Sequence, residues 1–377
     1  MIATLYLFAA VLAASLQTLP TPERADGDVV CAPAVYAAPP EDCLPLGPSA
    51  TYARLAASGI DLTQDPLPAY RPDPSLNNIP YLYFKVDPGG VAVYPSLEAA
   101  AARQGASRYI APGFLYVSYL QRAETEQGVF YMLPSGEWIE GAGSRVSPPV
   151  FQGLLFARTP RQAFGWIISE TNTFQAPNYN FNNPRVRTLY RQTQIIIYAQ
   201  HSEGNAKWYL IGPDEWVEAR FVAAVFPNPT PPAGVTNNRW IEVNLEQQTL
   251  AVYDEGQMRF ATLISSGVEK FWTQPGLFQI YQKKDAETMS GAFEADRSDF
   301  YYLQNVPWTM YYDQARALHG AYWQTLLGYQ RSHGCVNLSI GDSRWLYDWA
   351  REGDWVWVHD PSGRTPTDPS LYGSGGF

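Results

Sequence analysis

Two stretches of the chain share one pattern, and that pattern constrains the fold of its middle part. One starts at Phe114 (FLYVSYLQRAETEQGVFYMLPSGEWIE) and the other at Ile195 (IIIYAQHSEGNAKWYLIGPDEWVE). Each contains a strand of β-branched and aromatic residues, a polar turn with glycine, a second aromatic strand, a tight turn, and then EWIE or EWVE. Short strands separated by such turns predict small β-barrels. We therefore expect two β-barrel-like repeats, at residues 79–150 and 151–226.

The composition favours the same fold class. Aromatic residues make up 14% of the chain, which also has 31 prolines and 29 glycines, and this balance is typical of β-rich proteins with many turns. The repeats resemble bacterial Src-homology-type β-barrels, which often sit beside cell-wall enzymes. Trp138 and Trp216 occupy equivalent places in the two repeats, and we interpret both as core or turn anchors. The sequence thus predicts a mainly β protein.

The charge of the chain argues against some partners. The net charge is -10, and no run of basic residues occurs. Nucleic acid binding needs clustered Lys and Arg, so no nucleic acid partner is expected. An acidic surface is compatible with a substrate that carries free amines.

The N-terminal residues predict export. An apolar run extends from Ile2 to about Leu19 and is followed by the polar, proline-containing stretch LPTPERADGD. We interpret residues 1–25 as a signal peptide or an N-terminal membrane anchor, with a buried soluble helix as the alternative. Either form of export would place the protein outside the cytoplasm, at the cell wall or cell surface, secreted or membrane-anchored.

Cysteine placement agrees with export. Cys31 and Cys43 lie in a proline-rich segment, where a disulfide is plausible in an oxidising compartment. Their pairing would leave Cys335 as the single free thiol. We interpret residues 26–78 as a linker that contains one short helix, within TYARLAASGIDL.

The last third of the chain has its own strand pattern. A linker at residues 227–238 precedes an alternating strand from Arg239, a hairpin turn at residues 254–256 and a further strand. The polar segment 283–299 is interpreted as a lid loop or a solvated excursion. A helix within DSRWLYDWAREGD and a final strand WVWVHD complete a domain at residues 239–360, followed by a flexible tail at 361–377.

Catalytic residue types gather between Ala317 and Ser339. This stretch holds His319, His333 and Cys335 in a setting rich in Gly and Ser. A thiol near an imidazole is the arrangement of a cysteine nucleophile. The same three residues could instead bind a metal, or the segment could be core. No CxxC pair, HExxH motif or carboxylate completes a zinc site, and a core would have to bury a polar run. His319, which comes from another strand, is a better candidate for the base than His333, which lies only two residues before the thiol.

The arrangement of HG and, further on, SHGCVN resembles the signature of the L,D-transpeptidases, cysteine enzymes that cross-link bacterial peptidoglycan. The resemblance extends back to about Arg239 and covers roughly the last third of the chain. It implies a mixed, mainly β sandwich with a short helix, which agrees with the alternation of the strands.

The resemblance also implies a role for each site residue. Cys335 would be the nucleophile, His319 the general base, and the Gly320 carbonyl would orient the imidazole. His333, Gly334 and Cys335 would form the oxyanion hole, largely through main-chain N–H groups. Ser332 and Asn337 would brace the loop and the substrate; many members of the family carry Arg in place of Asn337. The aromatic residues that could line the groove are Tyr302, Trp308, Tyr312, Tyr322 and Trp323, although each of them taken singly is more often a core residue.

The implied reaction is acyl transfer. The thiolate attacks a carbonyl of a tetrapeptide stem, D-Ala leaves, and a thioester remains. The side-chain amine of a neighbouring stem then gives a 3→3 cross-link, whereas water would make the protein an L,D-carboxypeptidase. The partners implied are peptidoglycan stem peptides, with no cofactor and no metal. The alternative from another class is an inactive protein that binds the cell wall through its repeats.

Overall fold

The computed structural model describes residues 54–60, 67–141, 144–148, 150–292 and 294–372, and the chain separates into units of residues 1–63 and 64–377. In the first unit, residues 54–57 are helical and Gly59 ends the turn with a φ of +74°, within the stretch where a short helix is predicted. The N-terminal apolar run lies outside the described residues, as do Cys31 and Cys43. Over the ranges given above, no helix has the length and apolar character needed to cross a bilayer.

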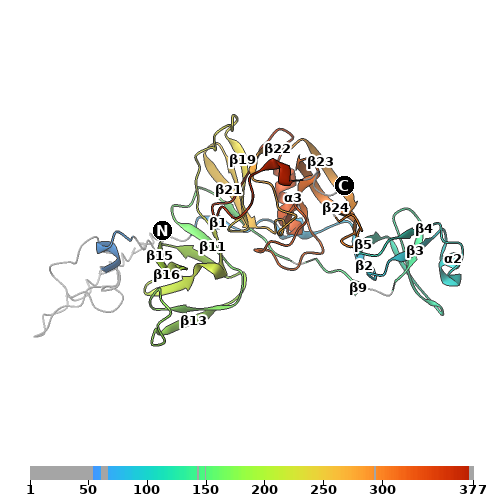
Figure 1. The fold of residues 1–377 in the computed structure, drawn as a ribbon, viewed down its shortest axis with the longest axis horizontal. Helices are drawn as coiled ribbons and strands as arrows, with labels where there is room; N and C mark the ends of the chain where they lie inside the picture. Colours follow the sequence, from blue (N-terminus) through green and yellow to red (C-terminus); the bar gives the residue numbers. More distant parts are fainter. Residues whose placement is uncertain (1–53, 61–66, 142–143, 149, 293, 373–377) are drawn as a thin grey trace, which may run out of the picture. The chain divides into compact units, whose positions relative to one another are not determined.

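The second unit contains a seven-stranded sheet to which the last third of the chain contributes five strands (Figure 1). Its pairs are antiparallel except for the parallel pair of β19 and β27. In spatial order the strands are β1 (Ala69–Tyr70), β10 (Leu154–Phe156), β21 (Gln257–Leu263), β20 (Thr249–Asp254), β19 (Arg239–Asn244), β27 (Trp355–His359) and β22 (Gly276–Gln279). Glu255 and Gly256 join β20 to β21 with φ values of +50° and +70°, so the predicted hairpin turn is confirmed.

A second sheet carries the residues of the predicted site. In spatial order its strands are β26 (Val336–Leu338), β25 (Arg316–Gly320), β24 (Tyr301–Asp313), β5 (Phe114–Tyr119), β2 (Leu82–Lys85) and β9 (Ser144–Arg145), and β23 (Gln282–Gly291) also pairs with β24. One buried cluster combines Val243 and Val252 of the first sheet with Met310 and Leu318 of the second. The mainly β fold is confirmed. Residues 283–291 form a strand, so the predicted loop there is wrong over most of its length.

The helix α3 (Ile340–Trp349) packs its Leu346 into the same cluster. It begins two residues before the predicted stretch because the Ser339 hydroxyl accepts a hydrogen bond from the Asp342 N–H at 3.2 Å. The Asp342 carboxylate in turn accepts from the Gly153 N–H at 2.9 Å and from the Thr262 hydroxyl at 2.5 Å. This buried carboxylate therefore joins the helix to strand β21 and to the residues before β10.

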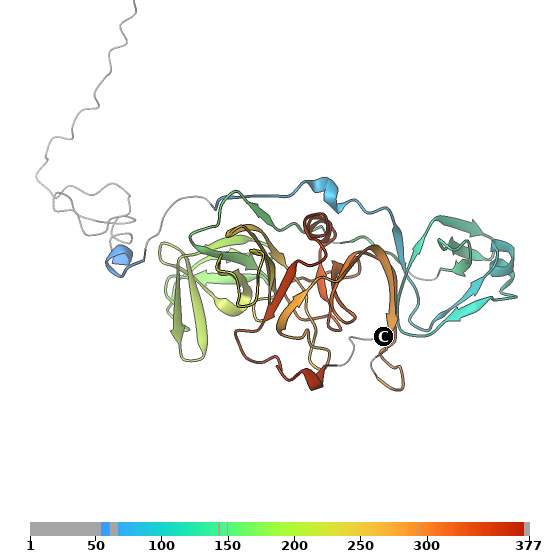
Figure 2. The ribbon, with the colours of Figure 1, turned by 90° about the horizontal axis from the view of Figure 1, so that it is seen from above.

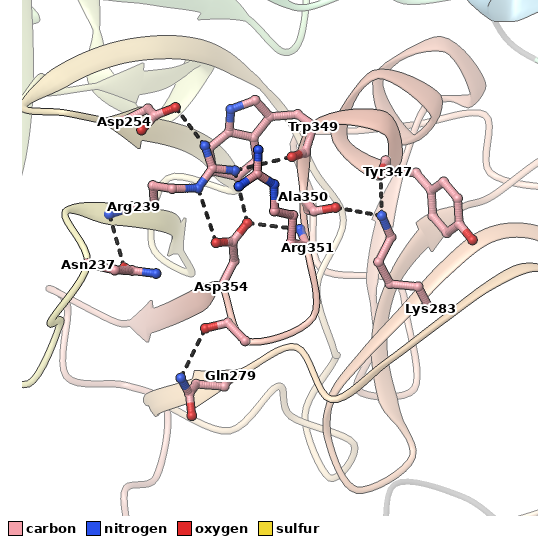
Figure 3. Close-up of polar contacts among 11 residues, drawn as sticks. Asn237, Arg239, Asp254, Gln279, Lys283, Tyr347, Trp349, Ala350, Arg351 and Asp354 are labelled. Atoms are coloured by element: carbon pink, nitrogen blue, oxygen red, sulfur yellow. Dashed lines mark hydrogen bonds and ion pairs between the residues drawn. The ribbon is translucent and has the colours of Figure 1, made fainter.

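Two cations fix the C-terminal end of α3 (Figure 3). The Lys283 ammonium donates to the carbonyl oxygens of Tyr347 at 2.6 Å and Ala350 at 2.5 Å, which a helix end leaves without helical partners. The Arg239 guanidinium donates to the Trp349 carbonyl at 3.2 Å and forms an ion pair with Asp354 at 3.1 Å. These contacts hold the end of the helix against β19 of the first sheet and β23 of the second.

The two sequence repeats pair their strands in the same order. In the first, β2 pairs with β5 and β9, β3 (Val91–Tyr94) pairs with β4 (Arg108–Ile110) and β8 (Trp138–Glu140), and β7 (Gly128–Met132) joins β8 to β6 (Gln121–Thr125). In the second, the equivalent strands are β11 (Ala163–Ile167), β14 (Gln194–Ile197), β18 (Val222–Val225), β12 (Thr171–Phe174), β13 (Arg185–Leu189), β17 (Glu215–Glu218), β16 (Ala206–Gly212) and β15 (Ala199–Glu203). A short helix, α2 (Leu97–Ala102), belongs to the first repeat alone. Their likeness to Src-homology barrels stays a prediction.

The first repeat is continuous with the sheet of the predicted site. β5 pairs in parallel with β24, and Figure 2 shows the blue-green strands of this repeat beside the orange β24. The proposed linker and tail also make fixed contacts. The 3-10 helix η1 (Pro74–Asn77), expected to be linker, packs on α3. The tail, expected to be flexible, forms η3 (Pro369–Leu371) before the described residues end at Tyr372.

Candidate active site

Two neighbouring strands bring His319 and Cys335 to the same place. β25 and β26 run parallel, with His319 opposite Asn337. Cys335 precedes β26 and lies two residues before Asn337, and side chains two residues apart on an extended chain point to the same face. The imidazole and the thiol therefore face the same side of the sheet, and both line one cavity.

Hydroxyl groups hold the loop before Cys335 in shape. The Ser332 hydroxyl donates to the Cys335 carbonyl oxygen at 2.5 Å and accepts from the Gly334 N–H at 3.2 Å. The Thr273 hydroxyl donates to the Gly334 carbonyl oxygen at 2.8 Å. Gly334 has a φ of +114°, in the region that favours glycine. These bonds fix the direction of the main-chain N–H groups around Cys335.

The imidazole of His319 is buried and neutral. Its exposed fraction is 1%, and its Nδ1 lies 3.4 Å from the Gly320 carbonyl oxygen, with the ring of Trp323 at 5.7 Å. Burial lowers the pKa of His319 to about 4, because the imidazolium would lose its hydration. At neutral pH this side chain therefore has a lone pair with which to accept a proton.

The thiol of Cys335 is protonated in the free protein. Burial raises its pKa to about 11, and this effect outweighs a backbone hydrogen bond at Ala317 and the charge of Arg316, which both lower it. The free protein therefore does not show the lowered thiol pKa that many reactive cysteines have. The Cys335 thiol and the His319 imidazole are therefore both uncharged at neutral pH.

Sequence reasoning missed Arg316. Its side chain is 4% exposed and forms an ion pair with Asp313 at 2.8 Å. A Cβ added at Gly334 would lie 3.3 Å from Arg316 Nε, so the guanidinium packs against the loop before Cys335. The Tyr372 ring lies 5.2 Å from the guanidinium carbon. The only sequence signal was a charged residue at the start of an otherwise apolar strand, RALHG.

The cavity has a volume of about 660 Å³, a size suited to a small peptide. Five of the predicted site residues line it, namely His319, Ser332, His333, Cys335 and Asn337. His333 is exposed, and its ring stacks on Phe271 with centroids 4.6 Å apart. The backbone of Asn337 pairs with that of Ser265, which lies just after β21. This pairing connects this end of the cavity to the end of β21.

Two predicted substrate contacts lie elsewhere. Tyr322 and Trp308 are 1% and 4% exposed and belong to a buried cluster, so the structure places them in the core. The Tyr322 hydroxyl donates to the Gln304 carbonyl at 2.9 Å. Of the other aromatic candidates, Trp323 does line the cavity. Over the described part of the chain, no three His, Cys, Asp or Glu side chains gather as metal ligands.

Known proteins share this part of the chain. Residues 238–358 match the family model of the L,D-transpeptidase catalytic domain, YkuD. YciB of Bacillus subtilis, which carries the name of a candidate L,D-transpeptidase, is 24% identical over 127 residues. That match covers 29% of this chain and 59% of YciB, so the chain spans about three-fifths of this curated relative.

Solved structures of L,D-transpeptidases are also similar. The enzyme from Stackebrandtia nassauensis is 27% identical, over 34% of this chain and 57% of that chain, with a TM-score of 0.27. The catalytic domain from E. faecium is 27% identical, over 33% of this chain and 100% of that chain, with a TM-score of 0.30. The resemblance to the L,D-transpeptidase catalytic domain, predicted from residue 239 onward, is confirmed.

Proposed function

Because residues 238–358 carry an L,D-transpeptidase catalytic domain, we propose that the protein is an exported peptidoglycan L,D-transpeptidase that forms 3→3 cross-links. The observation that supports this most directly is the pair of Cys335 and His319 in one cavity of about 660 Å³. A protonated thiol beside a neutral imidazole is ready for general-base activation, since the imidazole can accept the proton as the sulfur attacks.

The steps follow from these two groups. His319 takes the thiol proton while the sulfur of Cys335 bonds to the carbonyl carbon of the donor stem. The tetrahedral intermediate collapses, D-Ala leaves with the proton from His319, and a thioester remains. The amine of a second stem attacks the thioester, transfers a proton to His319 and forms the amide. The proton returns to the sulfur as the thiol leaves.

The negatively charged oxygen of the tetrahedral intermediate, the oxyanion, needs hydrogen-bond donors near the sulfur. We assign the oxyanion to main-chain N–H groups of the loop at Cys335, including the N–H of Cys335 itself. The positive charge of Arg316 behind Gly334 would stabilise the same negative charge. A single oxyanion donor is typically worth roughly 3 kcal/mol of barrier lowering.

The test is turnover of disaccharide tetrapeptides by the full chain. The wild-type protein should yield cross-linked dimers and free D-Ala, and Cys335→Ala should yield neither. His319→Gln should reduce both products by at least about a hundredfold, the usual contribution of a general base. Activity that persists in Cys335→Ala would reject the mechanism.

The same assay identifies the acceptor. Tripeptide without dimer would indicate an L,D-carboxypeptidase, because water would then resolve the thioester. Mass spectrometry after reaction with a carbapenem gives a second readout, since an adduct on Cys335 requires an accessible, acylating thiol. Absence of both products and of the adduct would leave a role in binding the cell wall.

A further inference from the structure

The cavity that holds Cys335 is built partly from the first repeat. Pro88, Pro112, Gly113 and Phe114 belong to that repeat and line the same cavity. All four lie outside residues 238–358, where the chain matches the catalytic domain. The site therefore includes residues that the family match does not contain.

These four residues form one wall of the cavity, and backbone contacts hold it in place. The Phe114 N–H donates to the Phe300 carbonyl oxygen at 2.8 Å, and Phe114 stands opposite Tyr301 in the parallel pair of β5 and β24. At Gly113 an added Cβ would lie 2.1 Å from the Phe300 carbonyl oxygen, so this close approach requires glycine. The wall is thus bonded to the strand that leads into the site.

The wall has a definite chemistry. The Phe114 side chain is 44% exposed, and two prolines add further apolar surface. Arg297 also lines the cavity, with its guanidinium 4.8 Å from the centre of the Phe300 ring. An apolar surface near a guanidinium fits a peptide that presents small apolar side chains close to a carboxylate.

We infer that the first repeat is a substrate-binding wall of the transpeptidase site and that Phe114 contacts the peptide stem of the acyl donor. This inference rests on the proposed function and deepens it. A module that only anchored the enzyme to the bacterial cell wall would not place its own residues in the cavity that holds Cys335.

The test compares Phe114→Ala with wild type in the full chain. KM for a disaccharide tetrapeptide should rise about tenfold, the typical effect of truncating an aromatic contact, while kcat stays within about twofold. The rate of Cys335 alkylation by iodoacetamide should not change, because that small reagent does not need the wall. Phe114→Leu keeps apolar bulk and should raise KM less than Phe114→Ala does.

Leu120→Ala is the matched control, because Leu120 is 61% exposed in the same repeat and does not line the cavity. An unchanged KM in Phe114→Ala, or an equal rise in Leu120→Ala, would overturn the inference. Calorimetry of tetrapeptide binding to Cys335→Ala, with and without Phe114→Ala, tests this inference separately from the proposed reaction. Weaker binding with Phe114→Ala supports a substrate-binding role of the first repeat even if the wild-type protein makes no dimer. Equal binding overturns that role.

Discussion

The ring of Tyr83 in the first repeat stacks on the ring of Tyr322, with centroids 3.5 Å apart and planes 14° from parallel. Tyr322 meets Trp323 edge to face at 4.8 Å, and Trp323 lies 5.7 Å from His319. The Tyr83 hydroxyl also donates to the Asn305 carbonyl at 2.7 Å. A continuous row of rings therefore runs from the repeat to His319, the proposed general base.

We expect Tyr83→Ala to affect both stability and the site. Removing a fully buried aromatic ring should lower the free energy of unfolding by about 3–5 kcal/mol. Loss of the stack should also loosen Trp323 and His319, so the rate of carbapenem acylation should fall. Urea unfolding and mass spectrometry measure the two effects. Tyr83→Phe keeps the ring, loses one hydrogen bond and should cost only about 1 kcal/mol, so equal losses in the two variants would contradict the stacking argument.

The pKa of Cys335 predicts how its reactivity depends on pH. Because burial raises this pKa to about 11, the thiolate fraction at pH 7 is small and grows as the pH rises toward 11. The rate of alkylation by iodoacetamide should therefore increase throughout the range from pH 7 to 10. A rate that is already constant above pH 7 would indicate a thiolate–imidazolium pair in the free protein.

Arg316 should lower the pKa of the Cys335 thiol. Arg316→Met removes the positive charge behind Gly334, so the pKa of Cys335 should rise further and alkylation at a given pH should slow. It also leaves Asp313 buried without its ion pair, which costs about 3–5 kcal/mol of stability. Arg316→Met combined with Asp313→Asn should recover stability and keep the slower alkylation. Recovery of both would assign Arg316 a purely structural role.

Asp342 should make stability depend on pH. Burial raises its pKa from 3.8 to about 6, so the folded protein keeps a proton that the unfolded chain has released. The resulting stabilisation is fully present below pH 3.8 and is lost as the pH rises through about 6. The free energy of unfolding should fall by about 3 kcal/mol across this range, at 1.36 kcal/mol per pKa unit.

Urea unfolding at pH 4, 5, 6 and 7 measures this effect. Asp342→Asn should flatten the decrease between pH 4 and 6, because the amide does not titrate. Asp348→Asn, which changes a 49% exposed side chain on the same helix, should leave the profile as in the wild type. The same slope in Asp342→Asn as in wild type would exclude Asp342 as its source.

Much of the fold follows from local sequence. Alternating residues set strand β19, the residues after Asp254 set a hairpin turn, and Ser339 caps α3. The sequence also pointed to Cys335 and His319 as a candidate pair, since glycine and serine precede Cys335 where the loop needs them. These features depend on contacts between residues that are close along the chain, or on backbone shapes that one residue type favours.

Sequence by itself thus determined the strand pattern and the helix, and it pointed to Cys335 and His319 as the proposed nucleophile and base. Tertiary structure alone decided that Phe114 pairs with Tyr301 across 187 positions of the chain, that Arg316 lies buried beside Gly334, and that Tyr322 packs in the core. Pairings over such separations cannot be predicted from sequence periodicity, because the alternating pattern of a strand is the same whichever strand it pairs with. The pKa values of Cys335 and His319 were undecided for a related reason: burial sets them, and burial exists only once distant segments have closed over the site.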